Sequence, residues 1–422
     1  MYTLVAALYP ICRSITGNGL RDTLRRIAGE IPIVVHEVPS GTQVFDWTVP
    51  KEWNIRDAYI KNSRGERIVD FTLSNLHVVN YSVPVHKTVS RQELLAHVHT
   101  LPDHPDWIPY RTSYYTESWG FCLQHAQLQQ LNEPEYEVCI DSSLENGHLS
   151  YGEACLPGES TETVILTCHC CHPSLCNDNL SGIALATWLV KFLAAEKRRY
   201  SYRILFIPGT IGSITWLAKN EALAPQIRHG LVLACVGDAG TVTYKKSRAG
   251  NAVIDRAVEN VLRHSGEKHA MVDFSPYGYD ERQFNSPGFD LHVGRFSRTP
   301  HGEYPQYHTS ADNLELVRPE ALADSYRKCL AILRVLENNR TYRNVQPKCE
   351  PQLGKRGLYR DMGGYSNARD IEMAMLWVLN LSDGSNSLLD IAQRARMPFD
   401  SIHDAARLLG RHGLLEQVEL HG

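Results

Sequence analysis

The chain has 422 residues and a formal net charge of −4, with 43% hydrophobic and 21% charged residues. This length predicts two or three domains, and the composition is typical of a globular protein. A slightly acidic chain has no general electrostatic attraction for nucleic acid or for an anionic membrane. Neither is therefore an expected partner.

Targeting signals are absent from the sequence pattern. No apolar run reaches the roughly 18 residues that a membrane-spanning helix needs. The N-terminus, MYTLVAALYPICRSITG, has no leading positive charge and no small-residue cleavage site, so it predicts the start of a helix. Eleven cysteines in a large chain without a secretion signal favour reduced thiols. We expect a cytoplasmic protein.

The first part of the chain predicts an inserted domain. Residues 19–31 have a helical pattern, and residues 33–38 form a strand-like run. Residues 44–143 are rich in aromatic, proline and β-branched residues, and Asn62–Gly65 stands between two strand-like runs as a hairpin signal. We interpret 44–143 as a β-rich domain inserted into an α/β domain made of residues 1–43 and 144–340.

From about residue 149 onward, strand and helix patterns alternate. The strand-like runs are unbroken and apolar, as expected when both faces of a sheet are covered. Alternation of this kind predicts a three-layer α/β domain with a mainly parallel central sheet. The expected strands are 163–169, 202–208 and 230–237, and the expected helices are 181–196, 213–221, 251–265 and 319–339.

The C-terminal part predicts a separate module. Residues 341–365 are rich in glycine, proline and charge and are interpreted as a linker. Three short helical patterns and a closing apolar run then predict a winged helix-turn-helix domain over 366–422. From residue 355 to the end there are eight Lys/Arg and nine Asp/Glu, whereas DNA-reading modules are basic. Domain packing or a protein contact is the favoured role.

The most informative motif spans residues 167–182. It places His169, His172 and Asp178 at the carboxyl end of a predicted strand, where open α/β sheets carry their ligand sites. Zinc accepts imidazole and carboxylate ligands, and catalytic sites leave a position for water. One histidine alone is more often a hydrogen-bonded core group, but this combination predicts a metal site. The four cysteines among these residues are interpreted as small buried side chains rather than thiolate ligands.

A second motif, residues 304–313, precedes a long predicted helix. His308 could complete a metal site with Asp178, and Asp312 could orient its ring. The alternative is an ordinary helix start in which Ser310 or Asp312 caps the helix.

Two further motifs are weaker. Asp238 follows an apolar strand and is either a ligand to a second metal or a turn former. The run 278–284 includes Glu281, which could bind a substrate end or lie in a solvated turn.

The order of these residues resembles that of the zinc aminopeptidase clan that includes bacterial leucyl aminopeptidase and glutamate carboxypeptidase. That clan has a strand-end histidine, an aspartate before a small-residue helix start, a Gly-Ser helix, a further aspartate and a final His-Thr. The matching positions here are His169, Asp178, Gly212–Ser213, Asp238 and His308–Thr309.

Longer segments are similar to the aminopeptidase-like proteins encoded in bacterial polysaccharide and natural-product gene clusters. This resemblance implies an aminopeptidase-like domain with an inserted β domain and a C-terminal winged helix. It rests on residues 8–17, 38–60, 99–115, 119–123 and 302–317. One departure concerns catalysis: Gly209 stands where the family pattern has a glutamate that would act as general base or metal ligand.

The leading hypothesis is a zinc-dependent hydrolase of an aminoacyl, peptide or acyl amide in a small molecule or short peptide, with one or two zinc ions. The expected ligands are His169, Asp178 and His308, with His172 as an alternative to His169 and Asp238 for a second ion. Glu281 or Glu303 could replace the missing base. A homo-oligomer is possible. Gly209 favours a pseudo-enzyme as the first alternative, and a winged-helix regulator is the second.

Overall fold

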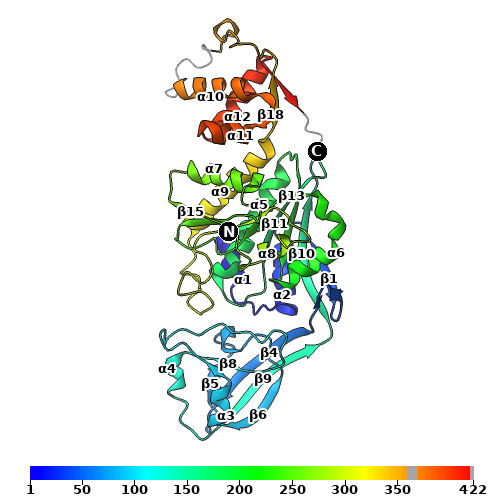
Figure 1. Cartoon of the computed structure of the whole chain (residues 1–422). Helices are drawn as coiled ribbons and strands as arrows, with labels where there is room; N and C mark the ends of the chain where they lie inside the picture. Colours follow the sequence, from blue (N-terminus) through cyan, green and yellow to red (C-terminus); the bar gives the residue numbers. More distant parts are fainter. Residues whose placement is uncertain (359–367, 419–422) are drawn as a thin grey trace. The chain divides into compact units, whose positions relative to one another are not determined.

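The structure, a computed structural model, describes residues 1–358 and 368–418 (Figure 1). The chain forms two compact units, one of residues 1–249 and 272–326 and the other of residues 250–271 and 327–422. No helix within the described residues is long and apolar enough to cross a membrane.

A mixed β-sheet organises the first unit (Figure 1). Its four central strands run parallel to one another, whereas the strand that flanks them on either side is antiparallel to its neighbour in the centre. The predicted α/β class with a large central sheet is confirmed, and the parallel part is confined to its centre. In sheet order the strands that lie wholly in this unit are β1 (Val34–Pro39), β10 (His148–Leu156), β12 (Ser201–Ile207), β11 (Thr163–His169), β13 (Ile227–Leu233), β16 (Val293–Ser297) and β14 (Val242–Lys245).

Both faces of this sheet are covered. Ile165, Val232 and Val293 share one hydrophobic core with residues of helix α6 (Ile211–Lys219). The residues next to them along the strands are also buried, although they do not belong to that core. Burial on both faces of the sheet explains the unbroken apolar runs in the sequence. Helix α5 (Ser181–Ala195) packs on β11 and β13. Helices α1 (Tyr2–Leu8), α2 (Asn18–Ala28) and α8 (Glu281–Phe284) also lie in this unit.

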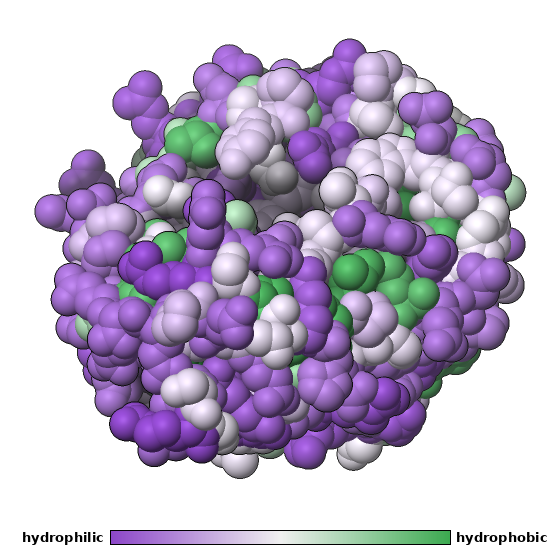
Figure 2. Space-filling model, turned by 90° about the horizontal axis from the view of Figure 1, so that it is seen from below, coloured by the Kyte–Doolittle hydropathy of each residue, from purple (hydrophilic) through white to green (hydrophobic). Residues whose placement is uncertain are grey.

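A second sheet forms from the segment that the sequence predicts as a β-rich insertion. Its strand order is β5-β4-β9-β6, and the predicted hairpin joins β4 to β5, with Gly65 in a left-handed conformation. Seen from below Figure 1, the surface is largely hydrophilic, with hydrophobic residues in small separate groups (Figure 2). The elements are β4 (Glu52–Lys61), β5 (Arg67–Asp70), β6 (Val85–Ser90), α3 (Arg91–Ala96), β7 (Val98–His99), β8 (Phe121–Cys122), α4 (His125–Leu128) and β9 (Glu135–Glu145), after the short pair β2 (Gln43–Val44) and β3 (Trp47–Thr48).

The second unit contains the C-terminal helices and a three-stranded sheet with the order β18-β17-β19. Arg256 binds Asp390 and Gln393, which joins helix α7 to the helices of this module. Residues 341–344, which the sequence places in the linker, form strand β17 and pair with β19. The predicted linker and winged helix also include residues 359–367 and 419–422, which lie outside the described residues. The elements are α7 (Val253–Arg263), α10 (Ala368–Leu381), α11 (Leu388–Ala395), α12 (Phe399–Arg411), β17 (Thr341–Asn344), β18 (Asp383–Ser387) and β19 (Leu415–Val418), while β15 (His269–Val272) and α9 (Pro319–Asn338) cross the boundary between the units.

Candidate metal centre

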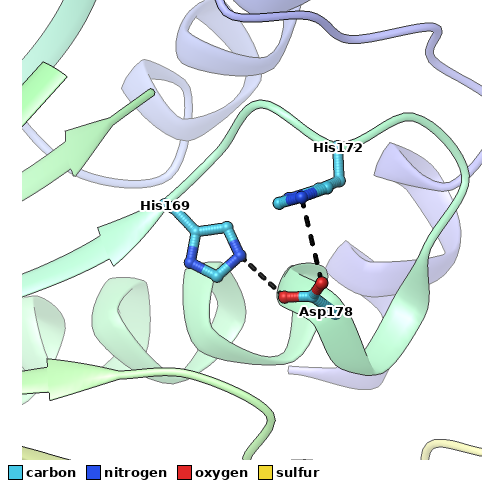
Figure 3. A group of neighbouring side chains, drawn as sticks. All are labelled: His169, His172 and Asp178. Atoms are coloured by element: carbon cyan, nitrogen blue, oxygen red, sulfur yellow. Dashed lines mark hydrogen bonds and ion pairs between the residues drawn. The ribbon is translucent and has the colours of Figure 1, made fainter. Parts of the chain in front are cut away.

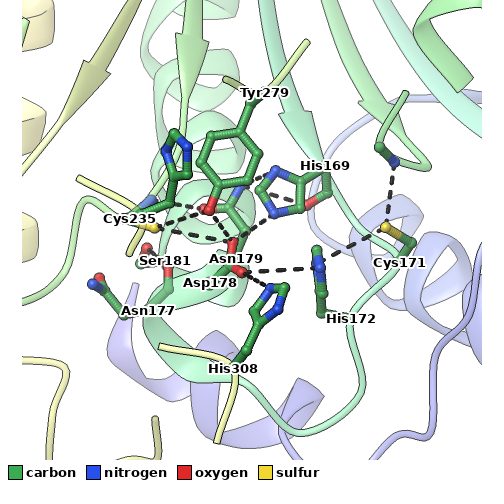
Figure 4. A network of polar contacts seen from close by, with 12 residues as sticks. His169, Cys171, His172, Asn177, Asp178, Asn179, Ser181, Cys235, Tyr279 and His308 are labelled. Atoms are coloured by element: carbon green, nitrogen blue, oxygen red, sulfur yellow. Dashed lines mark hydrogen bonds and ion pairs between the residues drawn. The ribbon is translucent and has the colours of Figure 1, made fainter. Parts of the chain in front are cut away.

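Three imidazoles converge on one buried carboxylate at the carboxyl edge of the central sheet (Figure 4). Figure 3 shows two of them, His169 and His172, beside Asp178. His169 is the last residue of β11, and its Nε2 lies 2.7 Å from Oδ1 of Asp178. The Nε2 atoms of His308 and His172 lie 2.9 Å and 3.9 Å from Oδ2 of the same residue. Asp178 itself is 0% exposed. The sequence left His169 and His172 as alternatives, but the structure brings both to Asp178.

The electrostatics keep this cluster able to bind a cation. Burial disfavours the charged form of Asp178, but the His172 and His169 rings and the hydrogen bonds from His169 and His308 outweigh it and hold its pKa well below the usual range. Burial also lowers the pKa of His172 to about 3, so this ring is neutral at pH 7 and keeps a lone pair. An ionised carboxylate beside a neutral imidazole is the donor chemistry that zinc accepts. These residues therefore fit a metal ion.

Backbone interactions explain the motif around Asp178. Asn179 accepts a hydrogen bond from the backbone N–H of Cys235 and donates to the carbonyl of Leu233 at the end of β13. A Cβ atom on Gly182 would lie 2.4 Å from that same carbonyl oxygen, so only glycine permits the close approach of α5 to the strand. The amide and small side chains of the motif thus fix the loop that carries Asp178.

Asp312 supports this loop from the other side. One of its oxygens accepts the backbone N–H of Asn177 at 2.6 Å, and the other accepts that of Asp178 at 3.0 Å. Burial raises the pKa of Asp312 to about 7. The sequence predicts that Asp312 orients His308, whereas these contacts show that it holds the backbone at Asp178.

His308 is positioned by a segment of the insertion. Its backbone has a φ of 55°, and its carbonyl accepts a hydrogen bond from the N–H of Tyr110 at 2.8 Å. The Tyr110 ring lies 5.3 Å from that of His172 and 5.0 Å from that of His308, edge to face in both cases. The segment that the sequence predicts as an insertion therefore contributes a ring that packs on two of the three imidazoles.

The other candidate residues lie elsewhere. Asp238 accepts hydrogen bonds from the Thr299 hydroxyl at 2.6 Å and the Asn177 side chain at 2.9 Å. Among the described residues, the donor atoms that lie within 4.8 Å of one another belong to His169, His172 and Asp178, a set that includes neither Asp238 nor His308. Glu281 is 0% exposed and pairs with Lys245 at 3.0 Å, so the expectation of a solvated turn is wrong. Glu303 is an exposed loop residue.

Gly209, which stands where the family pattern has a glutamate, adjoins the cluster of candidate metal ligands. A Cβ atom on Gly209 would lie 3.7 Å from Cβ of His169 and 3.6 Å from Sγ of Cys171, both ordinary van der Waals distances. The next residue, Thr210, has a φ of 63° and donates its backbone N–H to Asp280 at 2.7 Å. A longer side chain therefore has room to start at position 209.

Sequence reasoning missed two groups that contact Asp178. Tyr279 donates its hydroxyl to Oδ1 at 2.9 Å and stacks on His169, with ring centroids 4.6 Å apart. The Cys235 thiol lies 3.9 Å from the same oxygen. No spacing pattern marked either residue. The cysteines of the first motif are buried free thiols, and burial raises their pKa values, which agrees with their interpretation as small core residues.

The fold and this edge cluster define a protein of the aminopeptidase-like α/β class. A crystal structure of a Clostridium acetobutylicum protein described as a peptidase matches with a TM-score of 0.94 and 55% identity, covering 99% of this chain and 96% of that one. A zinc aminopeptidase from Bacillus subtilis matches with a TM-score of 0.58 and 12% identity, covering 79% and 93%. At that identity the likeness shows the fold alone.

Residues 2–339 match the family described as a domain of unknown function (DUF4910), and the chain belongs to this family. Residues 340–417 match a winged helix-turn-helix family, which confirms the predicted C-terminal module. A Clostridium acetobutylicum protein named as a polysaccharide biosynthesis protein with aminopeptidase-like domain is 56% identical over 418 residues, covering 99% of this chain and 96% of that protein.

Proposed function

We propose that this protein is a zinc-dependent hydrolase of an amide bond in a small molecule or short peptide. The observation that carries the proposal is the convergence of the His169, His172 and His308 Nε2 atoms on the buried Asp178 carboxylate. The aminopeptidase-like fold supports it, because related folds hold zinc in a named aminopeptidase.

We propose a single zinc ion held by His169, Asp178 and His308, with His172 as a further ligand. Asp238 is occupied by Thr299 and Asn177, so no second carboxylate is offered to another ion at this point. A zinc ion bound here would supply Lewis acidity that polarises a carbonyl and lowers the pKa of water.

The chain's own residues have distinct tasks in this proposal. Tyr279 fixes the orientation of the Asp178 carboxylate through Oδ1, and Asp312 fixes the backbone that carries it. The Tyr110 ring packs against His172 and His308 and limits the movement of both imidazoles. Such support keeps a site preorganised, so less ordering is needed when a substrate binds.

Gly209 supports a second candidate, a metal-binding protein without turnover. A glutamate at this position would take a proton from water and return it to the leaving amine, which is worth about 10²–10⁴ in rate. Two carboxylates of the neighbouring segment each have one oxygen engaged: Oδ1 of Asp280 accepts from Thr210 and Ser213, and Oε1 of Glu281 pairs with Lys245.

The test is a zinc titration of chelator-treated protein followed by a screen of aminoacyl and N-acyl amides with and without chelator. We expect about one zinc per chain and chelator-sensitive release of amine. Zinc binding without release from any amide favours the second candidate. Protein that binds no zinc rejects both.

A further inference from the structure

A continuous wall of aromatic side chains borders the metal cluster. We call Tyr277, Tyr279, His301 and Tyr307 the aromatic wall. The His301 ring lies 4.7 Å from Tyr279 and 6.2 Å from Tyr307, and Tyr307 stacks on His308 at 3.9 Å. Tyr279 donates to Asp178, so two members of the wall, Tyr279 and Tyr307, contact the cluster. Tyr277 is 73% exposed and His301 is half-buried, so a ligand can reach the wall from solvent.

Arg295 determines the hydrogen-bonding state of His301. Its Nη1 lies 2.8 Å from Nδ1 of the imidazole. Arginine can only donate, so Nδ1 accepts, and in the neutral ring the proton is on Nε2. Burial and the charge of Arg295 lower the pKa of His301 to about 4, which keeps the ring neutral at pH 7. His301 therefore offers an N–H donor at Nε2.

Positive charge dominates behind this wall. Glu281 is the single carboxylate paired with both Lys245, at 3.0 Å, and Arg295, at 3.8 Å. Arg282 adds a third cation and lies 3.4 Å from the Thr210 hydroxyl. In the part of the chain that the structure describes, the buried Nε atoms of Arg282 and Arg295 have no hydrogen-bond partner, and neither do Oε2 of Glu281 and Oδ2 of Asp280, a carboxyl whose pKa burial raises. Excess positive charge of this kind attracts anions.

The same arrangement disfavours a substrate amine. An acidic side chain that binds a free amino group must present an uncompensated carboxylate. Glu281 is fully buried against two cations, and breaking such a pair is costly. The wall instead presents a neutral donor in front of cationic side chains.

We propose that the aromatic wall binds a carboxylate or other anionic group of the substrate, with Nε2–H of His301 as the donor. The substrate is then an amide that carries an acidic group rather than a peptide with a free N-terminal amine. This inference rests on the proposed function, because the bound molecule is a substrate only if the protein is a hydrolase. Its test measures binding and requires no turnover.

The experiment measures binding of three five-carbon probes to the full-length protein by isothermal titration calorimetry: glutarate, 1,5-pentanediol and 1,5-diaminopentane. Each titration is run on zinc-free protein and on protein loaded with one equivalent of zinc. We expect glutarate to bind at least about tenfold more tightly than the other two in both forms, in line with a hydrogen bond to a charged group. The titration of zinc-free protein excludes direct coordination of glutarate by the metal as the cause of its binding.

Variants of His301 separate the donor from the packing of its ring. His301→Phe keeps a ring but no donor, and should weaken glutarate binding about tenfold without changing zinc content. His301→Gln can accept from Arg295 and still donate, so it should recover part of the affinity. The control is His86→Phe, an exposed histidine of the insertion, which should change nothing. Equal glutarate affinity in native protein and His301→Phe, or a preference for the diamine, would overturn the proposal.

Discussion

Asp178 and Glu281 are both fully buried carboxylates in the same unit, but their partners differ in kind. Asp178 is surrounded by imidazoles and a tyrosine hydroxyl, whereas Glu281 is paired with Lys245 and Arg295. Protonated lysine and arginine have no lone pair to offer a metal, so they neutralise the carboxylate without adding a metal ligand. Imidazoles keep their lone pairs, so the Asp178 cluster remains able to take up a cation. Partners rather than burial therefore separate a candidate metal site from a structural ion pair.

The largest expected effect is on the structural side of this comparison. Glu281→Gln leaves two buried cations without their carboxylate and should lower the free energy of unfolding by about 3–5 kcal/mol. Zinc bound per folded chain should stay unchanged. Urea denaturation followed by tryptophan fluorescence measures the first quantity, and metal analysis measures the second. Glu162→Gln, which removes an exposed partner of Arg228, is the control and should have little effect. A stable variant with reduced zinc would assign Glu281 to the metal site.

The mirror-image change is Asp178→Asn. It removes the charge on which three imidazoles converge and should weaken zinc binding by more than about 100-fold, because loss of supporting groups alone costs about 10–100-fold. Competition with a chromogenic chelator measures the affinity. Asp238→Asn is the matched control and should keep the native zinc stoichiometry. A lower stoichiometry in that control would show that a second ion binds.

Gly209→Glu tests the missing base. On the amide that the chelator-controlled screen identifies, turnover should rise at least about tenfold, since general acid–base help is worth about 10²–10⁴. The distances from a Cβ atom at this position to its neighbours leave room for the new side chain. Gly209→Gln has nearly the same size without a basic carboxylate and should not accelerate turnover. Equal turnover in all three proteins, with zinc bound in each, would indicate another base.

A third buried carboxylate sharpens the comparison through pH. Asp312 accepts two backbone N–H groups and the Tyr304 hydroxyl and forms no ion pair among the described residues. Burial raises its pKa to about 7, above the roughly 3.9 of an unfolded chain. The folded zinc-free protein therefore holds this proton more tightly, so the stability from Asp312 is present at low pH and is lost as pH rises through about 7. The slope is at most about 1.4 kcal/mol per pH unit. Urea denaturation between pH 4 and pH 8 should show this decline in the native protein and a flatter profile in Asp312→Asn. Identical profiles would contradict it.

Much of the architecture follows from local patterns. Unbroken apolar runs predict strands covered on both faces, and the Asn62–Gly65 hairpin follows from its turn residues. The strand end at His169 and the helix start after Asp178 place two donors at one sheet edge, because the order of elements fixes that edge. His308 is predicted as a ligand because a histidine just before a long helix completes the order of site residues that resembles the zinc aminopeptidase clan.

The sequence by itself determined the class of fold and the residue types available for a metal site. Only the tertiary structure decided that His169 and His172 both turn toward Asp178, because the loop between them bends back over the sheet edge. It also decided that Asp238 and Glu281, equally plausible carboxylates in sequence, are held by Thr299 and by Lys245. Tyr110 and Tyr279 are far in sequence from His169 and Asp178, and no local pattern encodes which distant side chain will fill a given space. The residue types determine which donor atoms are available for a metal, whereas long-range packing determines which of these atoms come together.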